Sequence, residues 1–374
     1  MSGCWTGIRG HYVNHQNYVF GGGGQGMIIK NRVMHTPEGM RDLYGKSLQD
    51  RRALMKRIHD VFESFGYSDI ETPTIEYFDV FSSDIGTTPS NELYKFFDRD
   101  GNTLVLRPDF TPSVARAAAM HFADSDFPLR LSYEGSTFVN SAEYQGRLKE
   151  SRQMGVELIG EDSAEADAEI IALTCRMLLA SGLKEFQVSV GEVNFYKALA
   201  DKSGLDEEST ETVRELISNK NFFGVAEVLD GTKAAPEVKE AMQKLPQLFG
   251  SAEIFDAAEA FALGKREKSA VARLRRIHEI LCGKGLDRYV SFDFGLLSKY
   301  NYYTGIIFSA FTYGTGEPVA RGGRYDLLLG HFGRENPAVG VGLYIDQLTS
   351  SLIRQGISYG GPAKEADTAG GCKA

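Results

Sequence analysis

Two short segments place carboxylates where a small ligand rich in hydrogen-bond donors could be held. In LVLRPDFTPSVAR, Asp109 and Thr111 lie at a turn between an alternating apolar stretch and a helix, which we expect Thr111 to cap. In SRQMGVELIG, strand alternation puts Gln153 and Glu157 on one face, and the glycine between them predicts an open floor there. Carboxylate oxygens accept hydrogen bonds from an ammonium group or an imidazole N–H. The alternative is an exposed sheet face with ordinary polar side chains.

Three glycine-containing segments allow more than one interpretation. YNYYTG carries Tyr302 and Tyr303, which are suited either to packing in a sheet or to lining a ligand. ARGGRYD, at residues 320–326, predicts either a tight turn or a backbone that approaches a ligand closely. FGGGGQG, at residues 20–26, lacks the Lys-Ser or Lys-Thr of a phosphate loop, so we expect residues 1–33 to form a flexible leader.

Composition excludes several classes of protein. The chain has 374 residues and a formal net charge of -9, which argues against a surface that tracks nucleic-acid phosphates. Its four cysteines are scattered without a CxxC pair, so neither a zinc site nor a disulfide framework is indicated. We find no apolar run long enough for a bilayer and no signal sequence. These features predict a cytoplasmic protein that needs no cofactor, metal or membrane.

Hydrophobic periodicity predicts an α+β fold, with a mostly antiparallel sheet flanked by helices and interrupted by a helical insertion. We expect a folded body at 34–352, the insertion at about 196–285 and a flexible tail at 353–374. The expected helices are 47–65, 164–179 and 342–352, and the expected strands are 67–75, 94–97, 103–106, 129–133, 154–159, 186–190, 289–294, 302–312 and 318–320.

The quoted segments resemble a known family. HTPEGMRDLYG, LRPDFTP, QMGVELIG, YYTG, GGRYD and PAVGVGL occur in the order and at about the spacing seen in the catalytic core of histidyl-tRNA synthetases, a class II aminoacyl-tRNA synthetase fold. The resemblance covers nearly all of residues 34–352. It implies that histidine contacts Asp109, Thr111, Gln153, Glu157, Tyr302 and Tyr303. The family commonly has Glu at the first of these positions, which implies a slightly altered pocket.

The same resemblance implies that the ATP site is dismantled. Synthetases of this family hold the phosphates with three arginines, and a guanidinium suits this task because it stays charged and binds phosphate bidentately. The corresponding positions here are Val139, Ser298 and Gln347. Arg147 is retained as a candidate anion contact. Amino-acid activation is therefore not expected.

A histidine pocket without an ATP site resembles the regulatory subunits of ATP phosphoribosyltransferase. That family implies a non-catalytic chain that a short catalytic subunit needs for activity, that contributes to feedback inhibition by histidine, and that forms a hetero-oligomer built on synthetase-like dimers. It also implies no anticodon-binding domain and no tRNA partner. Two alternatives are a truncated or unusual histidyl-tRNA synthetase core and a histidine-sensing module for another partner. The sequence leaves open whether inhibitory histidine lies in this pocket or at the contact with the catalytic subunit.

Overall fold

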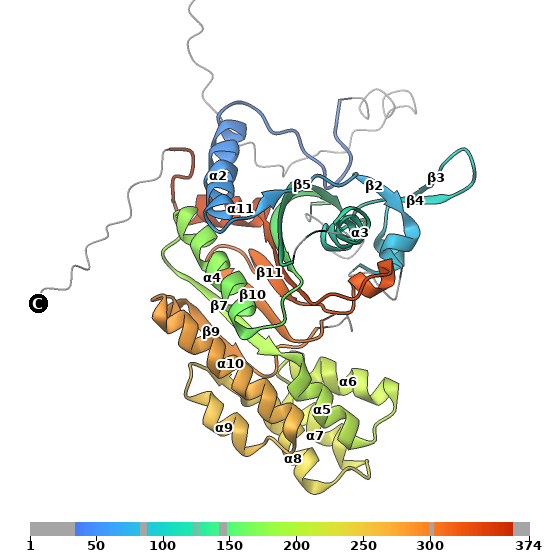
Figure 1. Ribbon diagram of the computed structural model, residues 1–374, viewed down its shortest axis with the longest axis vertical. Coiled ribbons are helices and arrows are strands. Elements are labelled where there is room, and N and C mark those ends of the chain that lie inside the picture. The colour runs from blue at the N-terminus through green and yellow to red at the C-terminus, as the bar shows by residue number, and fades with distance from the viewer. Residues whose placement is uncertain are drawn as a thin grey trace, which may run out of the picture.

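The computed structural model describes residues 34–82, 88–122, 125, 127–141, 148–298 and 303–361. Its centre is a nine-stranded sheet in the order β1-β5-β6-β12-β11-β10-β7-β9-β8 (Figure 1). These strands are β1 (Ser68–Asp69), β5 (Leu129–Phe138), β6 (Glu150–Ile159), β7 (Phe186–Glu192), β8 (Phe249–Gly250), β9 (Val290–Asp293), β10 (Ile306–Thr312), β11 (Ala320–Arg324) and β12 (Ala338–Tyr344). All neighbours are antiparallel except β1–β5 and β7–β9. The predicted α+β class is confirmed.

Two helices cover one face of the sheet. They are α2 (Gly45–Ser64) and α4 (Ala164–Ala180), which pack against each other. The hydroxyl of Ser163 caps α4 by accepting a hydrogen bond from the Ala166 amide at 3.0 Å. Because α4 is apolar around most of its circumference, it is buried between the sheet and neighbouring helices.

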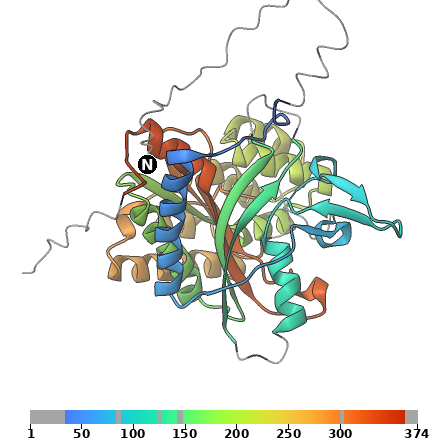
Figure 2. The same ribbon diagram turned by 90° about the horizontal axis from the view of Figure 1, so that it is seen from above.

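A small second sheet projects from the body as an arm (Figures 1 and 2). It contains β2 (Ile75–Tyr77), β4 (Thr103–Leu106) and β3 (Lys95–Phe97), in that order. The β3–β4 hairpin forms at the predicted DRDGN turn, where the Asp98 carboxylate accepts from the amides of Asp100 and Asn102, both at 2.9 Å. Helix α3 (Thr111–His121) follows β4 and leads toward the large sheet.

A helical lobe lies between β7 and β9 in the chain, at the lower end of Figure 1. It contains α5 (Val193–Ser203), α6 (Glu207–Ser218), α7 (Phe222–Asp230), α8 (Pro236–Lys244), α9 (Ile254–Ala260) and α10 (Lys265–Gly283). Elsewhere and within the lobe, the described residues include five short 3-10 helices: η1 (Phe78–Phe81), η2 (Ser90–Glu92), η3 (Leu245–Gln247), η4 (Asp287–Tyr289) and η5 (Leu329–Phe332). One continuous apolar cluster joins the lobe to the large sheet, so the two pack as one body.

The C-terminal part differs from the prediction. We expected a helix over 342–352, but residues up to Tyr344 belong to the central strand β12, and helix α11 (Ile345–Arg354) begins only after it. The chain beyond α11 still contacts the body, because the Arg57 guanidinium donates to the carbonyls of Tyr359 at 2.7 Å and Gly361 at 2.8 Å. The expected leader and residues 362–374 lie outside the described residues.

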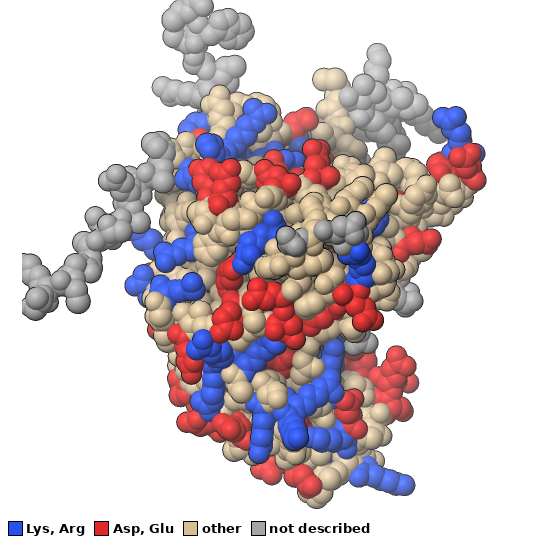
Figure 3. All heavy atoms as spheres, viewed as in Figure 1, with Lys and Arg blue, Asp and Glu red and all other residues tan. Residues whose placement is uncertain are grey.

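Acidic and basic side chains are mixed on the face shown in Figure 3. The described residues on that face form no continuous basic track. Among all described residues, no helix combines the length and the apolarity needed to cross a membrane.

Candidate ligand pocket

A cavity of about 850 Å³ lies over one face of the large sheet, between the loop before α3 and strands β6, β10, β11 and β12. Four of the predicted site residues line it, namely Asp109, Thr111, Gln153 and Tyr303. The predicted residues Tyr302 and Arg147 lie outside the described part of the chain. The cavity falls in the size range of small-molecule sites and leaves space beyond what an amino acid needs.

Glycines form the floor on which the polar side chains lie. A Cβ atom at Gly340 would stand 1.7 Å from Oε2 of Glu157, and one at Gly342 would stand 2.3 Å from Nε2 of Gln153. Such distances are far below contact, so no other residue fits at these positions without moving a site side chain. Strand β12 pairs with β6 so that Gly340 faces Glu157, and Gly342 faces Gly155.

The sequence predicted an open floor at Gly155, but the structure shows that this space is filled. The phenol of Tyr133 fills that space, since a Cβ atom at Gly155 would lie 2.3 Å from its hydroxyl oxygen. The Tyr133 ring stacks on the Phe110 ring, with centroids 4.4 Å apart. The guanidinium of Arg107 lies over the Phe110 ring, 3.9 Å from its centroid. The prediction failed because the occupant comes from the neighbouring strand β5.

Glu157 lies one layer behind the cavity lining and is only 1% exposed. Its carboxylate accepts hydrogen bonds from Thr111, at 2.7 Å, and from the hydroxyl of Tyr325, and both of these residues line the cavity. Burial raises the pKa of Glu157 to about 8, against the lowering effect of these hydrogen bonds. The carboxyl is therefore largely protonated at neutral pH, and a positive ligand would favour its ionisation.

Thr111 does not cap α3, contrary to the prediction. The N-cap residue is Phe110, which provides no side-chain cap, and the Thr111 hydroxyl donates to Glu157 instead. Asp109 bonds to the start of the same helix, because its Oδ1 accepts from the Phe110 amide at 2.7 Å. The same oxygen lies 3.4 Å from Nε2 of Gln153, so the polar ends of the Asp109 and Gln153 side chains lie close together in the cavity.

Tyrosines that the sequence analysis did not select complete the wall. Tyr325 and Tyr344 line the cavity beside Tyr303, and burial is the first cause of the raised pKa values of Tyr303 and Tyr344. Strand alternation from Gly323, whose added Cβ would stand 2.5 Å from the Tyr303 ring, would have placed Tyr325 on the cavity face. Tyr133 and Tyr344 carried no comparable signal, because their strand partners could not be read from the sequence.

The cavity also includes the three positions at which we expected arginines to be lost. Val139, Ser298 and Gln347 all line it. The Oε1 atom of Gln347 is buried and has no hydrogen-bond partner within the described residues. The basic residues of the lining lie outside these three positions, and each has a partner: Lys149 donates to Asn140 at 3.2 Å, Arg321 lies 3.8 Å from the Glu317 carboxylate, and Arg354 donates to the Gly314 carbonyl. The side chains at the three positions carry no charge.

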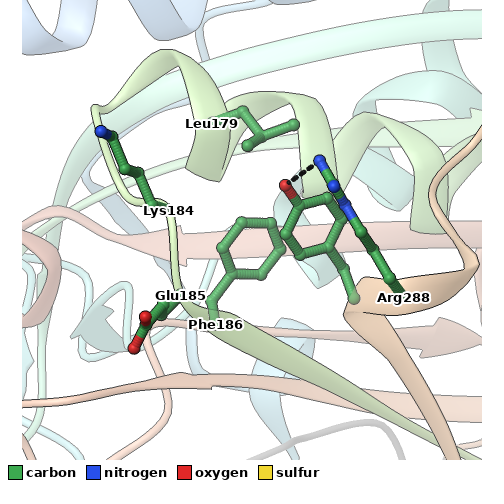
Figure 4. A pocket seen from close by; sticks show the side chains of 6 residues that line it. Leu179, Lys184, Glu185, Phe186 and Arg288 are labelled. Atoms are coloured by element: carbon green, nitrogen blue, oxygen red, sulfur yellow. Dashed lines mark hydrogen bonds between the residues drawn. The ribbon is translucent and has the colours of Figure 1, made fainter.

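A second hollow, of about 520 Å³, lies between the C-terminal end of α4, the start of β7 and η4 (Figure 4). The stacked rings of Phe186 and Tyr289 form its base, with centroids 4.4 Å apart, and Arg288 donates to the Tyr289 hydroxyl at 2.8 Å. None of the predicted site residues lines this hollow. The predicted chemistry is therefore concentrated in the larger cavity.

Comparison with known proteins identifies the family. The family model described as histidyl-tRNA synthetase matches residues 39–348. An ATP phosphoribosyltransferase regulatory subunit from Acetivibrio thermocellus is 41% identical over 329 residues, covering 88% of this chain and 79% of the relative. This chain belongs to the ATP phosphoribosyltransferase regulatory subunit family. The resemblance inferred from the sequence is confirmed.

Further matches agree with this assignment. A regulatory subunit from Ruminiclostridium cellulolyticum is 40% identical over 333 residues, covering 89% of this chain and 80% of the relative. A crystal structure described as an ATP phosphoribosyltransferase regulatory subunit/histidyl-tRNA synthetase from Bacillus halodurans superposes with a TM-score of 0.80, at 34% identity, covering 85% of this chain and 83% of that one. Histidyl-tRNA synthetase from Nostoc, at 21% identity, a TM-score of 0.73 and coverage of 86% and 76%, shares the fold.

Proposed function

We propose that this chain is the non-catalytic regulatory subunit of an ATP phosphoribosyltransferase, acting in the cytoplasm. It is required for the activity of a short catalytic subunit and contributes to feedback inhibition by histidine at the first step of histidine biosynthesis. Membership of the regulatory subunit family supports the regulatory role. One observation carries the finer proposal: a single cavity combines the polar residues Asp109, Thr111, Gln153 and Tyr303 with neutral residues at three positions expected to hold phosphate.

Histidine fits the polar set as a ligand rich in donors. Asp109 and Gln153 both line the cavity, and the carboxylate of Asp109 is the natural partner for an ammonium group. Thr111 and Tyr325 donate their O–H groups to Glu157, so this carboxylate fixes the direction of two hydroxyl groups that line the cavity. The ionised form of Glu157 accepts both of these hydrogen bonds best, and a cationic ligand favours that form.

The three neutral positions support the absence of activation chemistry. Attack of a carboxylate on the α-phosphorus of ATP develops negative charge on phosphoryl oxygens, which cationic donors must stabilise. Val139, Ser298 and Gln347 offer no such charge. By analogy with deleted oxyanion donors, each loss costs about 10²- to 10³-fold in rate. Arg147, which lies outside the described residues, is retained as a candidate anion contact.

Regulation requires that histidine distinguish two states of the complex. A ligand shifts an equilibrium only by its difference in affinity for the two states. We propose that histidine binds this cavity more tightly in the inhibited state of a hetero-oligomer, which is built on synthetase-like dimers of this chain. We propose that the chain acts without a tRNA partner.

The test is phosphoribosyl-ATP formation from ATP and phosphoribosyl pyrophosphate, using a short catalytic subunit with and without this chain. We expect activity to rise when the chain is added and to fall when histidine is then supplied. No effect on a competent catalytic subunit would refute the partner. Histidine-dependent exchange of pyrophosphate into ATP by the chain alone would instead support the synthetase alternative.

A further inference from the structure

The helical lobe holds the main chain that carries the Tyr303 ring. Lys197, on α5, donates from its ammonium nitrogen to the Tyr303 carbonyl at 2.8 Å. Three residues earlier on the same helix, Asn194 donates from Nδ2 to the Thr304 carbonyl at 2.7 Å. Two side chains of the lobe therefore bond to successive carbonyls at the cavity edge.

The other side of this segment is tied to the sheet. The Thr304 amide donates to the Arg324 carbonyl at 2.8 Å, and its hydroxyl donates to the Asp326 carboxylate, also at 2.8 Å. A third bond from α5 runs from the Val193 amide to the Gly305 carbonyl at 3.1 Å. The segment 303–305 is thus clamped between α5 and β11, and a change on either side would move it.

The first turn of α5 is itself fixed, so it can act as a support. Glu192 is the N-cap residue and is 2% exposed, and its carboxylate accepts from the Asn194 amide at 2.9 Å and the Phe195 amide at 3.2 Å. Its other oxygen accepts from Nδ2 of Asn194 at 2.6 Å. Arg266, from α10, donates to Oδ1 of the same Asn194 at 3.2 Å. Asn194 is therefore held by the last residue of β7 and by a residue of α10.

Lys197 is suited to a positioning role because its ammonium group is partly buried. Burial is the first cause of the lowered pKa of Lys197, with Arg266 acting in the same direction and Glu192 and Asp201 opposing it. A charged donor makes a stronger hydrogen bond than a neutral one, particularly away from water. Its bond to the Tyr303 carbonyl is consequently costly to break.

We propose that Lys197 is a positioning residue for Tyr303, which sets the affinity of the cavity for its ligand from the helical lobe. The Tyr303 ring lies against Gly323 with too little space for any Cβ there, so a shift of the 303–305 main chain moves the ring off its seat. The inference deepens the proposed function, because it rests on histidine as the ligand of this cavity. It makes the helical lobe part of the control of the pocket.

The experiment compares Lys197→Met with Lys239→Met in the full chain. Lys239 is a matched control because it also donates from the lobe to a main-chain carbonyl, that of Thr232 at 2.9 Å, but Thr232 does not line the cavity. Hydrogen–deuterium exchange of the ligand-free protein reports the 303–312 peptide. Calorimetry with L-histidine reports affinity, in each variant and in combination with Tyr303→Phe.

We expect Lys197→Met to speed exchange of the 303–312 peptide and to weaken histidine binding about tenfold, as loss of a charged hydrogen bond would. The effect should be non-additive with Tyr303→Phe and partly rescued by Lys197→Arg, while Lys239→Met stays at the wild-type values. Unchanged exchange in Lys197→Met would overturn the inference, as would unchanged affinity despite faster exchange. If the wild-type chain binds no histidine, the proposed ligand is wrong, and the exchange result alone decides whether Lys197 holds Tyr303.

Discussion

Replacing Glu157 by glutamine should change how the stability of the protein depends on pH. Burial raises the pKa of this carboxyl from 4.5 to about 8. Between these two pH values the folded state therefore keeps a proton that the unfolded state has released. When folding raises the pKa of an acid, its contribution to stability is fully present at pH values below the pKa of the unfolded state. The contribution is lost as the pH rises through the pKa of the folded state. Glutamine imitates the protonated carboxyl and has no proton to lose.

The magnitude follows from the separation of the two pKa values. Each unit corresponds to about 1.36 kcal/mol, so between about pH 5.5 and about pH 8 the Glu157 carboxyl should lower the free energy of unfolding by about 3 kcal/mol. Other buried acids, such as Glu192, whose pKa burial raises to about 7, also contribute to the slope. They are present in both proteins, so the difference between wild type and Glu157→Gln isolates this one carboxyl.

The assay is denaturant unfolding at several pH values in that window. The expected result is a free energy of unfolding that falls more steeply with pH in the wild type than in Glu157→Gln. Glu150→Gln, at the other end of the same strand β6 and only partly buried, is the matched control and should keep the wild-type slope. Parallel slopes for wild type and Glu157→Gln would mean that Glu157 is already ionised in the folded protein, and would refute this account of its burial.

Two further predictions concern packing and buried charge. Gly340→Ala should lower the free energy of unfolding by about 1–3 kcal/mol and displace Glu157, because a Cβ there would stand 1.7 Å from the carboxylate; Gly316→Ala, in the same cavity with nothing within 4 Å, should be neutral in the same denaturant titration. Arg324→Met should cost about 3 kcal/mol, since it removes one of the two arginines bonded to the carboxylate of Asp167, which is 0% exposed, and leaves Arg273 alone to pair with it. The exposed ion pair of Arg276 is the control for that variant, and Arg276→Met should cost about 1 kcal/mol or less by thermal or chemical unfolding.

Much of the fold could be predicted from the sequence because its elements have clear periods. The helix expected at 164–179 is observed as Ala164–Ala180, and the strand expected at 186–190 is observed as Phe186–Glu192. The hairpin around DRDGN was likewise found, because a turn of that composition needs few tertiary contacts. Local propensity and tertiary packing agree in these segments.

The sequence did not predict the whole of strand β12, because its glycines, which the site requires, are poor strand formers. Glycines at 340 and 342 weaken the strand signal of AVGVGLY, so the sequence suggested a helix from residue 342. Those glycines are required by Glu157 and Gln153, which lie directly over them. In this strand the space required by the site side chains determines the residue type, and intrinsic strand propensity does not.

The candidate site was predicted in part. Asp109, Thr111, Gln153 and Tyr303 do meet in one cavity, but the order of layers could not be derived from the sequence. Glu157 lies behind hydroxyl groups rather than at the surface of the cavity, because Tyr325, which directly follows β11 and is far from Glu157 in the sequence, packs over it. Such an arrangement depends on strand order, which periodicity does not encode.

The most direct test of the central claim is histidine inhibition of the assembled complex containing either the wild-type or the Glu157→Gln chain. Phosphoribosyl-ATP formation would be followed as histidine is titrated, with the Glu150→Gln chain as the control. If histidine is read in this cavity, Glu157→Gln should keep the uninhibited rate but need at least about tenfold more histidine for half-inhibition, because a buried acceptor has been lost. Identical inhibition curves for all three chains would contradict the account and place the regulatory histidine elsewhere.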